Sequence, residues 1–494
     1  MKAVIMAGGQ GTRLREVAAD IPKPMVPVCG KPILQYQLEN LRDNGIRDLI
    51  FVVGYLGEAI QDYFGDGSAF GVQIQYYTET YPLGTAGALY FLRDQLKEDC
   101  LLLMGDLMLS VDFSRFMEAH KAAGGLATLF VHPNAHPYDS DIIVTETVKR
   151  LEDYTEAAVE GRYAALENMA GEAGEASASL VLGVIGKKEP RSQFYHNQVN
   201  AGIYALSPSL LQTLPAPKTE ATLQAELAEA KAAGASEEAQ KKLWKSAKID
   251  LDKDVILPQI AKRAVYAYHS TEYVKDMGTP ERYEAVAADL QNGTVASRNL
   301  RKAQKCIFLD RDGTINKAAG FVRTPETLEL LPRAAEAIRR INASPYLAII
   351  VTNQPVIARG ELSFAGLDEI HAKLETELGK DGAYVDDLLF CPHHKDKGFA
   401  GEVSALKFDC SCRKPKPGLI LEAAARYHID LSKSWMIGDM TQDIACGKAA
   451  GLRTVLLQTG EGGRDGKYEA TPDRIAADLL EAVEGILRDA DCNL

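Results

Sequence analysis

Two separate sets of short apolar runs divide the chain and limit what it can fold into. The first set comprises residues 4–6, 49–53 and 101–104, and the second comprises residues 306–309, 347–351, 435–437 and 454–457. A helical pattern of Leu34, Leu38 and Leu41 lies between the first two runs. Uninterrupted β-branched runs that alternate with helical periodicity are typical of buried parallel strands. The sequence therefore predicts an α/β protein with two doubly wound domains.

A polar stretch separates the two sets. It contains Asn292-Gly293 and a basic run that ends before the first strand of the second set. We expect a first domain over residues 1–290, a linker over residues 291–304 and a second domain over residues 305–494. Two segments rich in good helix formers, residues 156–179 and 216–248, are expected to be inserted surface helices.

The composition narrows the class of protein. With 55 basic and 68 acidic residues among 494, the net charge is 55 − 68 = −13, which argues against a nucleic-acid or anionic-membrane binder. No apolar run reaches the roughly 18 residues of a membrane helix, and the N-terminus is too short for a secretory leader. We therefore expect a cytoplasmic protein with reduced cysteines. The negative net charge still allows a local basic pocket for a phosphorylated small molecule. The composition is compatible with a homo-oligomer.

A glycine-rich turn follows the first apolar run directly. The expected nucleotide-binding residues of this turn are Gly8, Gly9, Gly11 and Thr12. Glycines there let the backbone approach a triphosphate and bind its oxygens through N–H groups. Arg13 can bind phosphate oxygens bidentately, and Lys23 lies between two prolines on a stiff segment. The turn predicts a phosphate site.

Two carboxylates and a second glycine-rich turn strengthen this prediction. Asp106 follows the run at residues 101–104, and Asp276 follows Tyr273-Val274-Lys275. Two aspartates that meet over a triphosphate form a typical Mg²⁺ site, because this ion prefers a few oxygen ligands plus phosphates. Residues 82–87, Pro-Leu-Gly-Thr-Ala-Gly, form a turn that can pack flat against a base.

The order of these motifs, from Gly8 to Pro280, resembles the sugar-1-phosphate nucleotidyltransferase family, which has a Rossmann-like fold. The resemblance implies that Asp106 and Asp276 bind Mg²⁺, that Arg13 and Lys23 bind phosphates and act in catalysis, that Gly84 and Thr85 contact the nucleoside, and that Asn200 contacts the sugar. Lys188 is expected to bind the sugar phosphate, with Lys187 as the alternative. The reaction would be attack of a sugar-1-phosphate oxygen on the α-phosphorus of an NTP, with release of pyrophosphate.

One carboxylate indicates which base the nucleotide substrate carries. Glu79 stands just before the Pro-Leu-Gly turn, where the resembled family contacts the base. A carboxylate accepts well from the N1–H and N2–H₂ groups of guanine, which favours GTP. The alternative is that Glu79 is exposed or binds ribose.

The second domain opens on a pair of aspartates. Asp310 and Asp312 follow the run at residues 306–309. Two carboxylates at this spacing can divide the work of nucleophile and general acid/base, whereas a Ca²⁺ loop would need a glutamate where Phe321 stands. A hydroxyl and an amide for phosphate and a carboxylate for a metal stand at later strand ends, and two cations lie between them; these residues are Thr352, Asn353, Asp439, Arg413 and Lys414.

This order resembles the haloacid-dehalogenase superfamily of phosphatases. The resemblance implies that Asp310 is the nucleophile and Asp312 the acid/base, that Thr352, Asn353, Arg413 and Lys414 bind the phosphate or sugar, and that Asp310, Asp312 and Asp439 bind Mg²⁺. Only 40 residues separate Asp312 from Thr352, since 352 − 312 = 40, which is too few for a large cap domain. We expect a capless fold.

Three cysteines and a histidine gather in the second domain. Cys391, His393, Cys410 and Cys412 form a Cys₃His set that suits tetrahedral Zn²⁺, and His394 is the competing ligand. Four protein ligands leave no open position, so we expect a structural zinc that fixes the basic residues after Cys412.

Together the motifs of the second domain resemble the D-glycero-D-manno-heptose-1,7-bisphosphate 7-phosphatases and their histidinol-phosphatase relatives. Removal of the 7-phosphate would leave heptose 1-phosphate, which is of the substrate class of the first domain. The combined resemblance implies a bifunctional enzyme that makes a nucleotide-activated heptose for lipopolysaccharide-type carbohydrate metabolism. The alternative is a transferase for another sugar, such as mannose 1-phosphate, fused to a phosphatase of different specificity.

Overall fold

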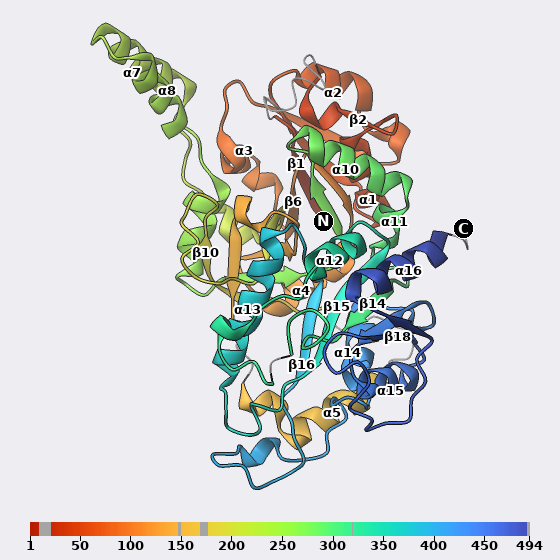
Figure 1. Ribbon diagram of the computed structural model, residues 1–494. Coiled ribbons are helices and arrows are strands. Elements are labelled where there is room, and N and C mark those ends of the chain that lie inside the picture. Colours follow the sequence, from red (N-terminus) through yellow and green to blue (C-terminus); the bar gives the residue numbers. More distant parts are fainter. Residues whose placement is uncertain (9–20, 147–149, 168–175, 319, 492–494) are drawn as a thin grey trace. The chain divides into compact units, whose positions relative to one another are not determined.

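The computed structural model describes residues 1–8, 21–146, 150–167, 176–318 and 320–491 (Figure 1). The chain forms two compact units. Unit 1 comprises residues 1–131, 176–184 and 200–291, and unit 2 comprises residues 132–175, 185–199 and 292–494. Unit 2 therefore includes two segments, 132–175 and 185–199, from the first 200 residues of the chain.

Unit 1 is built around a mixed sheet. Its strand order is β5-β4-β1-β6-β11-β8-β12-β10, and β7 pairs with β13 in a separate two-stranded sheet. The strands are β1 (Lys2–Met6), β4 (Asp48–Val53), β5 (Gln73–Thr78), β6 (Cys100–Met104), β7 (Leu107–Ser110), β8 (Ala127–His132), β10 (Ser179–Ile185), β11 (Val199–Leu206), β12 (Val265–His269) and β13 (Tyr273–Asp276). The three predicted runs of the first set lie in β1, β4 and β6, which are parallel to one another.

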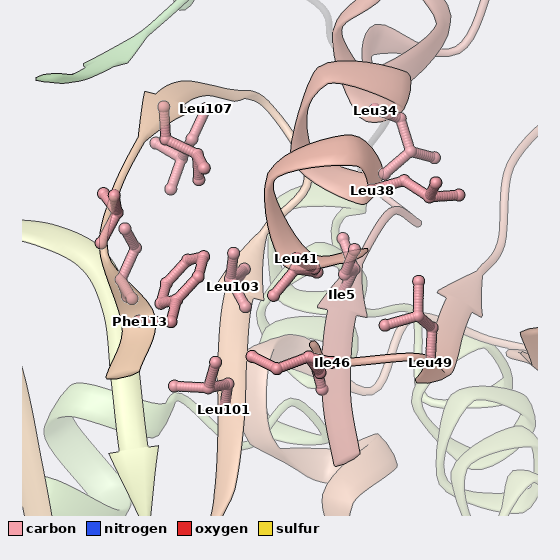
Figure 2. Packing of buried hydrophobic residues seen from close by; sticks show 14 of the residues in the cluster. Ile5, Leu34, Leu38, Leu41, Ile46, Leu49, Leu101, Leu103, Leu107 and Phe113 are labelled. Atoms are coloured by element: carbon pink, nitrogen blue, oxygen red, sulfur yellow. The ribbon is translucent and has the colours of Figure 1, made fainter. Parts of the chain in front are cut away.

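Unit 1 also contains helices, most of which cover this sheet. They are α1 (Ile33–Asp43), α2 (Gly57–Phe64), α3 (Gly84–Leu92), α4 (Phe113–Ala123), α6 (Pro208–Leu211), α7 (Glu220–Ala232), α8 (Glu237–Ser246), α9 (Leu257–Ile260) and α10 (Pro280–Gln291). Leu34, Leu38 and Leu41 of α1 are fully buried and pack with Ile5 and Leu103 of the strands (Figure 2). This contact is the reason that the three leucines recur at helical spacing.

Unit 2 contains a parallel sheet. Its strand order is β16-β15-β14-β17-β18-β19, and every neighbouring pair is parallel. The strands of this sheet are β14 (Lys305–Leu309), β15 (Tyr346–Asn353), β16 (Asp387–Cys391), β17 (Trp435–Gly438), β18 (Arg453–Leu457) and β19 (Arg474–Ala476). The four predicted runs of the second set form β14, β15, β17 and β18, so the doubly wound prediction is confirmed. The carboxyl ends of these strands meet at one edge, where ligands bind in such folds.

The remaining elements of unit 2 are mostly helices. They are β9 (Ile142–Thr145), α5 (Glu156–Glu167), α11 (Thr294–Ser297), α12 (Ala334–Asn342), α13 (Phe364–Lys380), α14 (Gly418–Tyr427), α15 (Thr441–Ala449) and α16 (Leu479–Asp491). The two predicted insertions contain α5 and the α7–α8 hairpin, which extends away from the sheet of unit 1 (Figure 1). In the part of the chain that the structure describes, no helix has the length and apolar character needed to cross a bilayer.

The stretch predicted as a linker is packed rather than free. Arg298 is 4% exposed, and its Nη1 donates to Asp386 Oδ1 at 3.1 Å. Gln304 is also buried, and its Nε2 donates to the carbonyl of Tyr427 at 2.7 Å. The polar composition that suggested a linker therefore reflects buried hydrogen bonds of unit 2.

Candidate active sites

Strand pairing brings Asp106 and Asp276 together in unit 1. Asp106 directly precedes β7, and Asp276 at the end of β13 is in register with Leu107 of β7. The backbone N–H of Met277 donates to the carbonyl of Asp106 at 3.2 Å. The two aspartates are 170 residues apart in the sequence, and they lie together at one end of the paired strands β7 and β13.

Each of these carboxylates pairs with a cation. Lys23 Nζ donates to Asp106 Oδ2, and Arg282 Nη1 donates to both Asp276 oxygens at 2.9 Å. Lys23 lies in a short 3₁₀ turn, Lys23–Met25, that follows Pro22. Carboxylates with partly exposed oxygens are the donors that Mg²⁺ prefers, so Asp106 and Asp276 fit this ion.

The turn before α3 is built by close backbone contact. Gly84 has φ +85°, and a Cβ at this position would lie 2.5 Å from the carbonyl oxygen of Ile249. Only glycine fits such a contact in the left-handed region. The hydroxyl of Thr85 accepts from the backbone N–H of Leu251 at 2.8 Å. Gly84 and Thr85 therefore shape the turn, and contact with a nucleoside stays a prediction.

Glu79 lies next to the start of the glycine-rich turn. A Cβ on Gly8 would lie 3.1 Å from Glu79 Oε2, and Glu79 Oε1 accepts from the backbone N–H of Leu83 at 3.3 Å. Burial raises the pKa of Glu79 to about 7, although Leu83 and Lys248 partly offset it. Glu79 therefore lies between Gly8 and the turn before α3, and the alternative of an exposed Glu79 is excluded because its side chain is half-buried.

This pKa gives a testable dependence of stability on pH. The carboxyl of Glu79 ionises more easily in the unfolded chain than in the folded one, so its contribution to the free energy of unfolding falls as pH rises from about 4.5 to about 7. Glu79→Gln should match the wild type at pH 4.5 and exceed its stability by roughly 1–3 kcal/mol at pH 8. Thermal unfolding at both pH values measures this, with Glu98→Gln, whose side chain is 81% exposed, as control. Equal differences at the two pH values would contradict the assignment.

The other predicted site residues of the first domain do not all lie in unit 1 or in the described part of the chain. Asn200 Oδ1 accepts from the backbone N–H of Gly202 at 3.0 Å, and its Nδ2 donates to Tyr204 and Asp252. Lys188 is exposed in the turn after β10 and belongs to unit 2. Four predicted residues lie outside the described part of the chain: Gly9, Gly11, Thr12 and Arg13.

A buried group of charges marks the edge of the unit 2 sheet. Asp310 follows β14, and Asp439 follows β17. With Asp443 they form a buried cluster whose carboxylate oxygens lie within 4.8 Å of one another. Lys414 Nζ lies 2.7 Å from both Asp310 Oδ1 and Asp443 Oδ1. Burial alone lowers the pKa of Lys414, but the two carboxylates outweigh burial and raise it, so the amine stays charged.

The cluster fits a divalent cation. Burial and the nearby Asp310 raise the pKa of Asp439 to about 8. Its Oδ1 is buried and makes no hydrogen bond within the described residues. Gly313, at φ +84°, leaves room for this carboxylate, because a Cβ there would lie 2.3 Å from Asp439 Oδ2. Three carboxylates around one lysine leave excess negative charge that Mg²⁺ would neutralise.

The structure adds a candidate metal ligand. The Asp312 carboxylate accepts from Arg311 Nη2 at 2.8 Å, Gln354 Nε2 at 3.0 Å and Asn316 Nδ2 at 2.9 Å, and its binding of Mg²⁺ stays a prediction. Asp443, which the sequence motifs did not indicate, joins Asp310 and Asp439 in the buried cluster. A carboxylate one helical turn after the predicted ligand Asp439 could have indicated it, since α15 begins between the two.

The end of β15 contacts the segment that carries Lys414. Asn353, at the end of β15, donates through Nδ2 to the carbonyl of Lys414 and accepts at Oδ1 from its backbone N–H, both at 3.1 Å. The Thr352 hydroxyl is buried and accepts from Gln354 Nε2 at 3.0 Å. Arg413 Nη1 donates to the carbonyl of His393 at 3.0 Å. Thr352, Asn353 and Lys414 therefore lie where β15 ends, beside Asp310.

The fold brings the four side chains of the predicted Cys₃His set together. Cys391, His393, Cys410 and Cys412 are all buried, and their ligand atoms lie within 4.8 Å of one another. His393 Nδ1 is 3.4 Å from Cys391 Sγ and 3.2 Å from Cys412 Sγ. The competing His394 instead contacts Arg359 Nη2 through its Nε2 at 3.1 Å. Four donors around one point, three of them sulfur, fit tetrahedral Zn²⁺.

Comparison with known proteins decides the family. The nucleotidyl transferase model matches residues 2–293, and a HAD-hydrolase-like model matches residues 411–482. The D-glycero-β-D-manno-heptose-1,7-bisphosphate 7-phosphatase of Rhodopseudomonas palustris is 42% identical over 145 residues, which are 29% of this chain and 78% of that protein. The enzyme of the same name from Pasteurella multocida is 37% identical over 186 residues, 37% of this chain and 98% of that protein. The chain therefore belongs to the nucleotidyl transferase family and to the family of heptose-1,7-bisphosphate 7-phosphatases.

Solved structures align with each part of this nucleotidyl transferase–phosphatase. The D,D-heptose 1,7-bisphosphate phosphatase of B. bronchiseptica, solved with magnesium and phosphate, is 34% identical and covers 38% of this chain and 99% of its own, with a TM-score of 0.34. HddC of Yersinia pseudotuberculosis, solved with GMP-PN, is 20% identical and covers 58% of this chain and 99% of its own, with a TM-score of 0.40. The family matches, rather than these structural alignments, show that the chain is an enzyme with a nucleotidyl transferase region and a phosphatase region.

Proposed function

We propose that this nucleotidyl transferase–phosphatase carries out two consecutive steps on one sugar. The phosphatase region removes the 7-phosphate of D-glycero-D-manno-heptose 1,7-bisphosphate. The transferase region then joins the resulting heptose 1-phosphate to a nucleotide, with GTP favoured. The buried Asp310–Lys414–Asp443 cluster is the observation that carries the proposal, because it supplies a nucleophile in a region related to heptose-bisphosphate phosphatases.

The phosphatase step follows from the placement of four side chains. Asp310 attacks the 7-phosphorus and forms an aspartyl-phosphate, and the P–O bond to the sugar breaks. Asp312 protonates the leaving alkoxide and then deprotonates the water that hydrolyses the aspartyl-phosphate. Lys414 and Thr352 neutralise and orient the phosphate oxygens. Mg²⁺, bound by Asp310, Asp439 and Asp443, would supply further neutralisation of the phosphate charge.

The transferase step needs positioning and charge rather than a general base. A phosphate oxygen of heptose 1-phosphate is already an anion, and it attacks the α-phosphorus of the NTP while the bond to pyrophosphate breaks. Lys23 binds phosphate oxygens, and Asp106 with Asp276 would bind Mg²⁺. The choice of GTP is supported by Glu79, whose half-buried carboxyl can accept from the guanine edge. We place both steps in the cytoplasm, where nucleoside triphosphates are available.

The zinc has a structural role in this scheme. The Cys₃His donors use all four positions of a tetrahedral ion, which leaves none for substrate. Arg413 and Lys414 follow Cys412 directly in the sequence. A zinc ion held by these four side chains would fix the segment from which Lys414 reaches Asp310.

The test is a reaction with the full chain. Heptose 1,7-bisphosphate, Mg²⁺ and each of GTP, ATP, UTP, CTP and dTTP are supplied separately, and phosphate, pyrophosphate and sugar nucleotide are measured. We expect phosphate with every nucleotide and pyrophosphate with GTP above all. Mannose 1-phosphate and histidinol phosphate serve as competing substrates. If no nucleotide gives a nucleotide-heptose, or if a competing substrate reacts faster, the proposed function is wrong.

A further inference from the structure

A segment inside the nucleotidyl transferase match belongs to the phosphatase unit. Residues 132–175 lie within the matched span of residues 2–293, yet they form part of unit 2. The segment contains a 3₁₀ turn, Leu151–Tyr154, followed by α5. In unit 2, α5 packs against α14 of the phosphatase region (Figure 1).

The turn contacts one of the zinc-binding residues directly. Nδ1 of His393 faces the sulfurs of Cys391 and Cys412, while its Nε2 is 2.8 Å from the backbone carbonyl of Tyr154. A carbonyl can only accept, so Nε2 carries the proton and Nδ1 is left with a lone pair for a metal. A metal-binding histidine is usually oriented by such an acceptor on its second nitrogen.

Aromatic packing fixes the position of this carbonyl. The Tyr154 ring is stacked on Phe364 at 5.3 Å and on Phe390 at 5.5 Å between ring centroids, and it lies 6.0 Å from the His393 ring. Tyr154 is 6% exposed. Its side chain therefore anchors the turn to α13 and β16, and the carbonyl cannot move far from His393.

The helix that follows covers the cysteines. Val159 and Tyr163 of α5 are 1% and 7% exposed and belong to the same apolar cluster as Cys391, Cys410 and Cys412. The Tyr163 hydroxyl donates to Glu422 Oε2 of α14 at 3.0 Å. These residues of the transferase sequence therefore form part of the apolar shell around the sulfurs, and such a shell controls the access of solvent to a metal site.

We propose that residues 151–167 are an integral part of the phosphatase zinc site, and that Tyr154 is a positioning residue for His393. The segment supplies the hydrogen-bond acceptor that sets the tautomer of His393 and an apolar cover over the cysteines. The effect reaches the catalytic group, because the carbonyl of His393 accepts from Arg413, the neighbour of Lys414. This inference rests on the zinc of the proposed function.

The first test compares zinc affinity in full-length variants. Zinc content of the wild type is measured first, and zinc is then titrated against a chromophoric chelator. Tyr154→Ala should weaken zinc binding about 10- to 100-fold, whereas Tyr154→Phe keeps the ring and the carbonyl and should bind as the wild type does. Tyr195→Ala is the matched control, because Tyr195 is also 6% exposed and lies in the other early segment of unit 2.

The outcomes separate the two proposals. If the wild type contains no zinc, the zinc of the proposed function is wrong. If the wild type binds zinc and Tyr154→Ala binds it equally tightly, or if Tyr195→Ala weakens binding as much, only the present inference is overturned. Weaker binding in Tyr154→Ala alone, with recovery in Tyr154→Phe, supports it.

A second test uses only the wild type and so does not depend on a variant that folds. Coupling between two sites is reciprocal, so removal of zinc should loosen the segment that supports it. Hydrogen exchange of the chelated protein should speed up in peptides from residues 151–167, relative to the zinc-loaded protein. The exchange rate should change less in peptides from residues 185–199. This segment also contacts α13, because the backbone N–H of Tyr195 donates to Thr376 Oγ1 at 3.0 Å. Equal change in both segments, or none in residues 151–167, overturns the inference.

Discussion

Asp310→Asn is expected to release no measurable phosphate from heptose 1,7-bisphosphate, a loss of at least about 10³-fold, while transfer to heptose 1-phosphate continues at the wild-type rate. An amide cannot form the phosphoryl intermediate, and the substitution also removes one of the two carboxylates that pair with Lys414. Phosphate release and pyrophosphate release, assayed separately with the two substrates, measure the two effects.

Glu329→Gln is the control for this variant. Its side chain is 67% exposed and pairs with Lys317, so the same carboxylate-to-amide change should leave both rates unaltered. Retention of more than about a tenth of the phosphatase activity in Asp310→Asn would exclude Asp310 as the nucleophile. A parallel loss of nucleotidyl transfer would mean that the two regions do not work independently.

Asp106→Asn should impair nucleotidyl transfer and spare the phosphatase, which is the reverse of the effect of Asp310→Asn. We expect nucleotidyl transfer to fall by about 10²- to 10³-fold, because the substitution removes a carboxylate proposed to bind Mg²⁺ beside the triphosphate. Phosphatase activity should stay unchanged. The same assays measure this, with the Mg²⁺ concentration varied, since weaker metal binding predicts partial recovery at high Mg²⁺.

Asp62→Asn provides the matched comparison, because Asp62 is an exposed residue of α2 in the same unit. An Asp106→Asn protein with unchanged transfer at every Mg²⁺ concentration would show that the ladder of β7 and β13 does not form the metal site. The pairing of Lys23 with Asp106 would then be a structural ion pair only.

Much of the fold could be predicted because buried parallel strands leave a simple pattern. A strand covered on both faces must be apolar along its length, and residues 347–351 and 101–104 meet this condition. The chemistry follows, because carboxyl ends of parallel strands share an edge and Asp310, Thr352 and Asp439 directly follow or end such strands.

The remaining features depend on contacts between distant residues. Asp443 lies on a helix, and only the fold shows that this helix begins beside Asp310. The Asp312 carboxylate accepts from Arg311 and Gln354, and donors of this kind leave no pattern in spacing. The choice between His393 and His394 likewise depended on which ring faces the cysteines.

The place of Tyr154 in the phosphatase unit has a consequence for gene architecture. A chain cut at residue 291 would separate the catalytic aspartates of the phosphatase from the turn that contacts His393 and from the helix that covers its cysteines. The rings of Phe364 and Phe390 would lose their stacking partner and face solvent, which favours aggregation. Fission into two free-standing genes would therefore require compensating substitutions, so we expect the two coding regions to be inherited as one reading frame.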